Sequence, residues 1–284
     1  TLFRSGTGGA TFPTAAQSLV LTPTVANYLA GDRSLELPAV GGIYRERSSL
    51  LGTIVDSSPT YLKTSTSVET VFVGANDGML HAFNGADGVE RFAYVPRGID
   101  LVKLKDYSDP DYGHRFFVDG PVVVSTKDEL ASQTVLVSTL GRGGKGLFAL
   151  DVTDPTLFNS TKVLWDKDAS FDNDLGNVLG TPLIANLNDG STAVIVPNGL
   201  NSSNERAVLF VLDLHTGGVQ AILDRASAPK PVEARGTGGA ASAGPLAFGS
   251  IVLATRSISA TVSAKTFCPM ASRASGLSET KYPS

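Results

Sequence analysis

Oxygen-bearing side chains between residues 166 and 174 are the strongest candidates for a metal site in this sequence. The stretch contains Asp166, Asp168, Asp172, Asn173 and Asp174. Calcium takes about six to eight oxygen ligands, often from a loop with alternating acids, a glycine and a later carboxylate. The stretch lacks that full pattern, and residues 186–190 are poorer still in carboxylates. We therefore treat Asp172, Asn173 and Asp174 as weak calcium candidates and favour solvated turns.

A glycine-rich segment, Gly141 to Gly146, invites a phosphate-binding interpretation. The nucleotide motif requires Gly-Lys followed by Ser or Thr at the start of a helix. Here Lys145 is followed by a glycine and then by Phe148 and Leu150, which alternate as in a strand. The context predicts a hairpin loop between two strands.

Histidine and cysteine offer little further chemistry. The histidines are His81, His114 and His215, and the single cysteine is Cys268. One cysteine excludes an internal disulfide and a zinc site of paired cysteines. The histidines are far apart in sequence, so only convergence in space could form a triad. His81 alternates with apolar residues and is expected in a core or ladder. We predict no catalytic residue, no cofactor-binding residue and no bound cofactor in this chain.

A repeat organises the segment that must position these residues. Each unit opens with a proline that follows a pair of mostly small residues and precedes an apolar strand. These prolines are Pro59, Pro121 and Pro182, at intervals of 62 and 61 residues. Proline is tolerated at the first position of a strand. Each unit then continues with three more short strands. They are predicted at residues 70–73, 82–84 and 90–95, then 134–137, 149–151 and 162–165, then 193–196, 211–213 and 219–223.

Four short strands repeated about every 60 residues are typical of the blades of a β-propeller. The fold class is therefore all-β, a partial, quinoprotein-like propeller of about three four-stranded blades. Three blades are fewer than the roughly four to eight that close a ring, so we expect an arc of a larger propeller. Phe92 and Trp165 fall in fourth strands, where packing between blades explains them best. Within the first unit, Asn76-Asp77-Gly78 predicts a tight hairpin turn with positive φ angles.

The two ends differ from this repeat. Residues 1–50 are predicted to form a lead-in segment, in which Thr22 caps a short helix, Pro23 occupies its first turn and Gly31 ends it. Residues 51–224 form the incomplete propeller. Residues 225–284 contain no Asp and are crowded with Ala, Ser and Gly, which predicts an irregular tail. Within it, residues 251–263 could form a strand without a partner in the repeat.

Two further expectations concern the origin of these ends. The loss of the repeat after about residue 224 suggests a shifted reading frame, which translation of the other frames would test. The first residue is Thr and no leader pattern follows, so we expect the front of a longer protein to be missing.

Overall composition narrows the classes of partner. The formal net charge is −4, which gives no reason to expect nucleic acid. No apolar run approaches the roughly 18 residues that span a bilayer, so we predict no transmembrane segment.

Several stretches resemble the C-terminal propeller of the PilC/PilY family of type IV pilus factors. They include Tyr44-Arg45-Glu46-Arg47, Val71 to Phe83, Phe117 to Pro121 and, most specifically, Gly141 to Pro155. The likeness runs from about residue 25 to 224, in family order.

The resemblance implies a non-catalytic protein outside the cell or at its surface. Such a protein supports pilus assembly, opposes retraction and mediates attachment. Its implied partners are pilus tip components such as minor pilins, and a host or abiotic surface. The family is associated with calcium through an Asp-rich loop that we do not find in this chain, so calcium belongs to the full-length family protein.

A dehydrogenase that uses pyrroloquinoline quinone is the alternative, because its propeller blades have similar features. Such an enzyme needs a base, a calcium ion and an enclosing ring. Since fold alone does not grant function, we interpret the chain as a binding protein and not as an enzyme.

Overall fold

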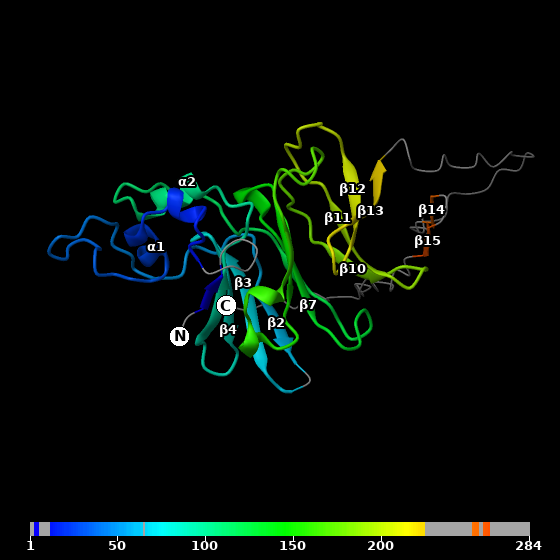
Figure 1. The fold of residues 1–284 in the computed structure, drawn as a ribbon, viewed down its shortest axis with the longest axis horizontal. Helices are drawn as coiled ribbons and strands as arrows, with labels where there is room; N and C mark the ends of the chain where they lie inside the picture. The colour runs from blue at the N-terminus through cyan, green and yellow to red at the C-terminus, as the bar shows by residue number, and fades with distance from the viewer. Residues whose placement is uncertain (1–2, 6–11, 65, 225–251, 256–257, 262–284) are drawn as a thin grey trace, which may run out of the picture.

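Three antiparallel sheets stand side by side in the computed structural model (Figure 1). It describes residues 3–5, 12–64, 66–224, 252–255 and 258–261. The first sheet contains β2 (Thr60–Lys63), β3 (Glu69–Ala75), β4 (Met79–Asn84) and β5 (Glu90–Tyr94). The second contains β6 (Val122–Val124), β7 (Val135–Thr139), β8 (Leu147–Asp151) and β9 (Val163–Lys167). The third contains β10 (Leu183–Asn186), β11 (Thr192–Pro197), β12 (Val208–Asp213) and β13 (Val219–Asp224).

The repeat predicted from the sequence coincides with the repeat of four-stranded sheets in the structure. Strands β2, β6 and β10 each begin one residue after Pro59, Pro121 and Pro182. In each of these three sheets the four antiparallel strands pair in sequence order, which is the order of a propeller blade, and the first sheet has a fifth strand beside β5. The three sheets do not close on one another (Figure 1), so the prediction of a partial propeller is confirmed.

Each sheet also carries the same irregularity between its third and fourth strands. The register shifts at Ala82/Phe83, at Ala149/Leu150 and at Val211/Leu212. An extra residue on one strand bends and twists the sheet locally. Because the shift is shared, positions in the three sheets can be matched by their distance from it. The residues immediately before Ala82, Ala149 and Val211 are therefore equivalent, and they are His81, Phe148 and Phe210.

Both faces of the second sheet are buried, and its strands divide their side chains between two cores. Leu136, Phe148 and Leu150 belong to the core shared with the first sheet. Val135, Val137, Leu147 and Ala149 belong to the core shared with the third sheet. Successive side chains of a strand point to opposite faces, so near-continuous apolar runs are required here. The central blade has apolar side chains on both faces and therefore depends on both neighbours.

Phe92 and Trp165 lie in these cores, as expected. The Phe92 ring stacks on Phe158, which follows β8, with 3.7 Å between ring centroids. The Trp165 indole Nε1–H donates to the Leu214 carbonyl at 2.8 Å, which joins β9 to the turn after β12. Trp165 is only 6% exposed. Packing between blades is thus the role of both rings.

The predicted turn between β3 and β4 has three residues, and only one of them has a positive φ. Gly78 has φ +95°, whereas Asn76 and Asp77 have negative φ. A three-residue hairpin loop needs a left-handed residue only at its last position. The expectation of several positive φ angles was therefore wrong. The Asp77 carboxylate stabilises the turn by accepting from the amides of Met79 at 3.2 Å and Gly52 at 2.8 Å.

Helix α1 (Pro23–Leu29) has the caps that the sequence predicts. The Thr22 Oγ1 accepts from the Val25 amide at 3.3 Å, and Pro23 occupies the first turn. Gly31, with φ +102°, follows the helix and lets the chain leave it without strain.

Replacing Thr22 by alanine should lower the free energy of unfolding by about 1 kcal/mol, because an amide of the first turn loses its side-chain acceptor. Urea denaturation of both proteins measures this. Thr22→Ser keeps the hydroxyl and is the control, so it should stay near the parent value. Equal losses in the two variants would contradict the capping role.

The lead-in between residues 31 and 50 is irregular and packs beside the first sheet. Its buried centre is an ion pair between Arg47 and Glu36, with Nε and Oε1 2.5 Å apart. The Arg47 guanidinium also lies 3.6 Å from the centre of the Tyr28 ring. Tyr28 and Tyr44 belong to the same core cluster as Phe92. The division of the chain at residue 50 stays a prediction, because this shared core crosses it.

Several elements were not foreseen. Helix α2 (Leu101–Lys105) follows Asp100, whose carboxylate caps it by accepting from the Val102 amide at 3.1 Å and the Lys103 amide at 3.2 Å. Strand β1 (Phe3–Ser5) pairs in parallel with β5. Short 3-10 helices cover Gln17–Leu19, Asp106–Ser108, Gly141–Gly143, Pro155–Leu157 and Ser160–Lys162.

The C-terminal region contains a pair of strands rather than one. Strands β14 (Val252–Thr255) and β15 (Ile258–Thr261) pair antiparallel with each other. The expectation of a single strand at residues 251–263 was therefore wrong. The other tail residues lie outside the described residues. The predictions of an irregular tail and of a shifted reading frame concern those residues.

Candidate functional site

The three weak calcium candidates lie in the connection between β9 and β10, and their polar groups have protein partners. The Asp174 carboxylate is buried and pairs with the Arg206 guanidinium, which holds the pKa of this carboxyl below its usual range. The Asp172 carboxylate accepts from the Asp174 amide at 2.7 Å. The Asn173 carbonyl accepts from the Asn204 amide at 3.2 Å. Arg206 thus sits where a cation would have to bind Asp174.

Within the described part of the chain, no three His, Cys, Asp or Glu side chains gather in an arrangement suited to a metal ion. The assignment of calcium to Asp172, Asn173 and Asp174 stays a prediction. In the neighbouring stretch, Asp166 joins the first two sheets by accepting from the Tyr94 hydroxyl at 2.6 Å and the Arg97 amide at 2.7 Å. Burial raises the pKa of Asp166 to about 6, although both donors act in the opposite direction.

The glycine-rich segment forms the hairpin loop between β7 and β8, as the sequence predicts. Its glycines allow close approach of neighbouring backbone. A Cβ on Gly143 would overlap the carbonyl group of Phe117, and a Cβ on Gly146 would meet Leu140 and Lys167. The loop therefore uses its glycines to dock on the segment that precedes β6.

His81 is buried in β4 between two carboxylates that the sequence did not connect with it. Its Nδ1 lies 2.5 Å from Glu90 Oε1, and its Nε2 lies 3.1 Å from both carboxylate oxygens of Asp77. The ring is 3% exposed. Burial lowers the pKa of His81, but Asp77 and Glu90 outweigh that effect and raise it to about 9. His81 is therefore an imidazolium at neutral pH.

This imidazolium should make stability depend on pH between about 6.5 and 9. The pKa is raised in the folded state, so the stabilisation is complete below pH 6.5 and is lost as pH rises through 9. The free energy of unfolding should fall by at most about 1.4 kcal/mol per pH unit in that window. Urea denaturation at several pH values measures it. His81→Gln should remove this slope, and an unchanged slope would contradict the ionised state.

The other two histidines have separate surroundings. His114 Nε2 lies 2.7 Å from Thr53 Oγ1 beside the first sheet. His215 Nε2 lies 3.1 Å from Gln133 Oε1 beside the turn after β12. The structure gives the three histidines different partners, so it does not assemble them into one site.

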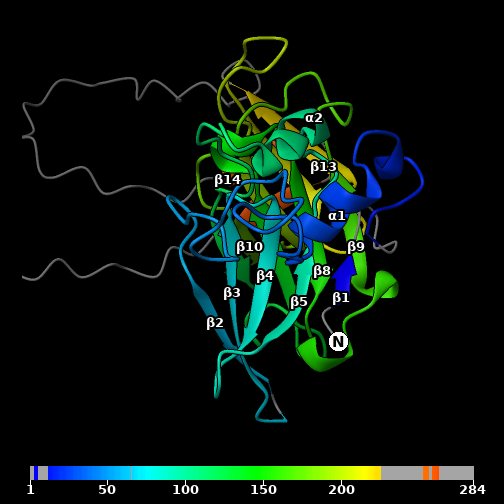
Figure 2. The same ribbon diagram turned by 90° about the vertical axis from the view of Figure 1, so that its left-hand side faces the viewer.

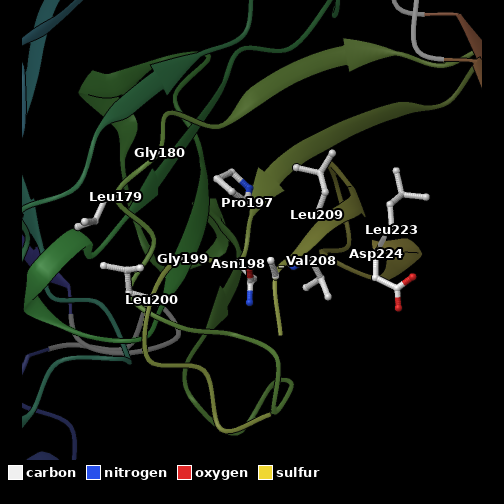
Figure 3. Close-up of a pocket in the computed structure, with 11 residues that line it drawn as sticks. Leu179, Gly180, Pro197, Asn198, Gly199, Leu200, Val208, Leu209, Leu223 and Asp224 are labelled. Atoms are coloured by element: carbon white, nitrogen blue, oxygen red, sulfur yellow. Dashed lines mark hydrogen bonds between the residues drawn. The ribbon is translucent and has the colours of Figure 1, made fainter. Parts of the chain in front are cut away.

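An apolar hollow of about 520 Å³ opens on the third sheet. Figure 3 shows Leu179 and Leu200 on one side of it and Leu209 and Leu223 on the other, with Pro197 between them. Leu200 is 59% exposed. The corresponding side of the second sheet is covered by the third, so this hollow marks the open end of the arc.

The architecture of these sheets agrees with a match to a known family. The family model described as the PilY1 beta-propeller domain matches residues 40–243. The chain belongs to the PilY1 β-propeller family. The resemblance to PilC/PilY proteins is thereby confirmed, and the match extends beyond the third sheet.

Curated relatives are named as PilY1 proteins or PilY1 homologues. A "Type IV pilus biogenesis factor PilY1 homolog" of Xylella fastidiosa is 43% identical over 217 residues, which cover 67% of this chain and 17% of the homologue. PilY1 of Pseudomonas aeruginosa strain UCBPP-PA14 is 42% identical over 201 residues, which cover 61% of this chain and 17% of that protein. The crystal structure of the Pseudomonas aeruginosa PilY1 C-terminal domain is 36% identical, with a TM-score of 0.42, over 55% of this chain and 30% of that one.

This chain spans 15–18% of the length of its curated PilY1 relatives. Among the described residues, no helix has the length and apolar character needed to cross a membrane.

Proposed function

We propose that this chain is the propeller portion of a type IV pilus biogenesis factor, and that it acts by binding and not by catalysis. Membership of the PilY1 β-propeller family carries the proposal. The relatives named as pilus biogenesis factors align with 61–69% of this chain. Pilus assembly, control of retraction and surface attachment are the activities we assign to the whole protein.

Loops on a constant frame provide the binding surfaces in this proposal. The connection between second and third strands has three residues in the first sheet, but runs from 140 to 146 in the second and from 198 to 207 in the third. Variable loops on a rigid scaffold are common sites of recognition. We expect minor pilins at the pilus tip, and a host or abiotic surface, to meet such loops outside the cell. Calcium binding is expected in the full-length protein.

A segment exchange tests the pilus role. In a Pseudomonas aeruginosa strain that lacks PilY1, we would supply PilY1 with residues 40–243 of this chain in place of its matching segment. We expect surface pili and twitching motility to return, whereas PilY1 with the segment deleted should not restore them. A chimera that reaches the cell surface at the normal level but gives no pili would contradict the proposal.

The absence of catalysis has its own test. Purified chain would be mixed with pyrroloquinoline quinone and calcium in the presence of an alcohol and a redox dye. We expect no dye reduction above a control without protein. Reduction that depends on both the quinone and the protein would favour the dehydrogenase alternative.

A further inference from the structure

A row of residues that crosses each sheet is covered in the first two sheets and open in the third. The row runs through the second, third and fourth strands, and its third-strand member stands two residues before the register shift. The rows are Gly74, Leu80 and Tyr94, then Thr139, Leu147 and Lys167, then Pro197, Leu209 and Leu223. Leu80 and Leu147 are buried, whereas Leu209 is half-buried and lines the apolar hollow of about 520 Å³ (Figure 3). The hollow therefore occupies a place that the other two blades cover.

At the first junction between sheets, the cover is the segment that leads into the next blade. The Val118 amide donates to the Ala75 carbonyl at 3.4 Å. A Cβ on Gly74 would overlap the Val118 carbonyl oxygen, which shows how closely this segment lies on the row. Val118 stands three residues before Pro121, the proline that opens the second blade.

The second junction is built in the same way. The Thr139 hydroxyl, a member of the row, donates to the Val178 carbonyl at 3.0 Å. Val178 stands four residues before Pro182, which opens the third blade. The sheets follow one another along the arc, with the first in front and the third behind in Figure 2. Each entry segment thus covers the sheet before it, and the row of the third sheet would need such a segment from the residues after Asp224.

The sequence contains a segment of this kind at the expected distance. Pro245 follows Pro182 by 63 residues, close to the earlier intervals of 62 and 61. Residues 243–248 read Ala-Gly-Pro-Leu-Ala-Phe, which is a small pair, a proline and an apolar run, as at the other entries. The family model also extends past the third sheet, as far as residue 243. The spacing and the family match therefore point to the same segment.

Length and charge both suit this segment to the hollow. The fourth strand is joined to the next proline by residues 95–120 in the first unit and by residues 168–181 in the second. The third connection, residues 225–244, is intermediate in length, so the chain can span the same distance. Residues 236–248 contain no Asp, Glu, Lys or Arg. Covering the leucines of the hollow with this segment would bury no charge.

We propose that residues 241–246 of this chain cover the hollow on the third sheet, as the entry segment of a further blade. Ser242, three residues before Pro245, takes the place that Val118 takes on the first sheet. The hollow is then an internal joint of the arc and not a site for a separate ligand. Any shift of the reading frame would lie beyond Pro245. The proposal goes beyond the pilus role and is independent of it, because it follows from the repeat of the sheets.

Disulfide cross-linking in the whole chain tests the position of the segment. Cys268→Ser first removes the single native thiol. Pro197→Cys and Ser242→Cys then place thiols at the positions where Gly74 and Val118 meet in the first sheet. Under mild oxidation we expect a disulfide within one chain, seen as loss of both free thiols and faster migration on a non-reducing gel. Its yield should not change with protein concentration.

A second cysteine position provides the control. Ser227→Cys replaces Ser242→Cys and stands nearer to Pro197 in the sequence, so random closure of the chain would favour it. We expect its disulfide yield to be at least fivefold lower. Equal yields at the two positions would overturn the proposal. A disulfide between two chains would also overturn it, because a second copy would then occupy the hollow.

A deletion tests the cover without any substitution in the sheet. Removing residues 241–246 should raise the fluorescence of 8-anilinonaphthalene-1-sulfonate at least twofold, because this dye binds exposed apolar surface. Removing residues 271–276, which are also mostly small, is the matched control and should leave the fluorescence unchanged. If the first deletion gives no increase, or both give the same increase, the segment does not cover the hollow. This measurement decides the question if Pro197→Cys folds poorly.

Discussion

Trp165→Ala should lower the free energy of unfolding by about 3–5 kcal/mol. The indole is 6% exposed in the core between the second and third sheets. Its removal leaves a cavity there, and the Leu214 carbonyl loses the donor that reaches it at 2.8 Å. A Cβ on Gly217 would contact the same ring, which shows how closely the third sheet approaches it. Urea denaturation monitored by far-ultraviolet circular dichroism measures the loss.

Trp165→Phe provides the matched control. Phenylalanine keeps an aromatic ring in the core but lacks the indole donor, so its cost should be clearly smaller than that of alanine. Amide hydrogen exchange should also report the difference, with faster exchange of β10 to β12 in Trp165→Ala. A cost below about 1 kcal/mol for the alanine variant would mean that the two sheets do not depend on this contact.

Gly143→Ala should cost at least about 3 kcal/mol, because the new Cβ would overlap the backbone of Phe117. A carbonyl group cannot rotate away as a flexible side chain can, so the loop or the segment before β6 must move. The expected result is a lower urea midpoint with the same fold at low denaturant.

Gly113→Ala is the control for that substitution. A Cβ on Gly113 would have no neighbour within 4 Å, and Gly113 does not have a positive φ. Its stability should change by less than about 1 kcal/mol, in the direction of greater stability if the backbone tolerates alanine. Equal losses at the two glycines would show that the loss does not come from the contact with Phe117.

The sequence allowed the blades to be predicted because their signals are local. A proline that opens a strand, an apolar alternation and a turn all lie within about ten residues of one another. Helix α1 was predictable for the same reason, since Thr22, Pro23 and Gly31 mark its two ends. Helix α2 was missed although Asp100 caps it, because five helical residues are too few for a clear helical period.

The side-chain cluster around His81 could not be predicted, because it depends on pairing between strands. Glu90 reaches His81 only because the register shifts between Ala82 and Phe83. No residue pattern in the sequence marks this register shift, although the structure shows the same shift in all three sheets. Contacts between sheets are still more remote, since Tyr94 and Asp166 are 72 residues apart. The partner of the calcium candidate Asp174 was equally hard to predict, because Arg206 lies 32 residues away in the sequence.

The stacking of consecutive sheets is tested most directly by nuclear Overhauser effects in the whole chain. Two contacts join neighbouring sheets: the Thr60 hydroxyl donates to the Val122 carbonyl at 2.8 Å, and Trp165 donates to Leu214. We predict cross-peaks between Thr60 and Val122 and between the Trp165 indole proton and the backbone around Leu214. Cross-peaks between Val137 and Ala149, which pair within one sheet, serve as the reference. If the reference appears and both contacts between sheets are absent, the blades form but do not stack.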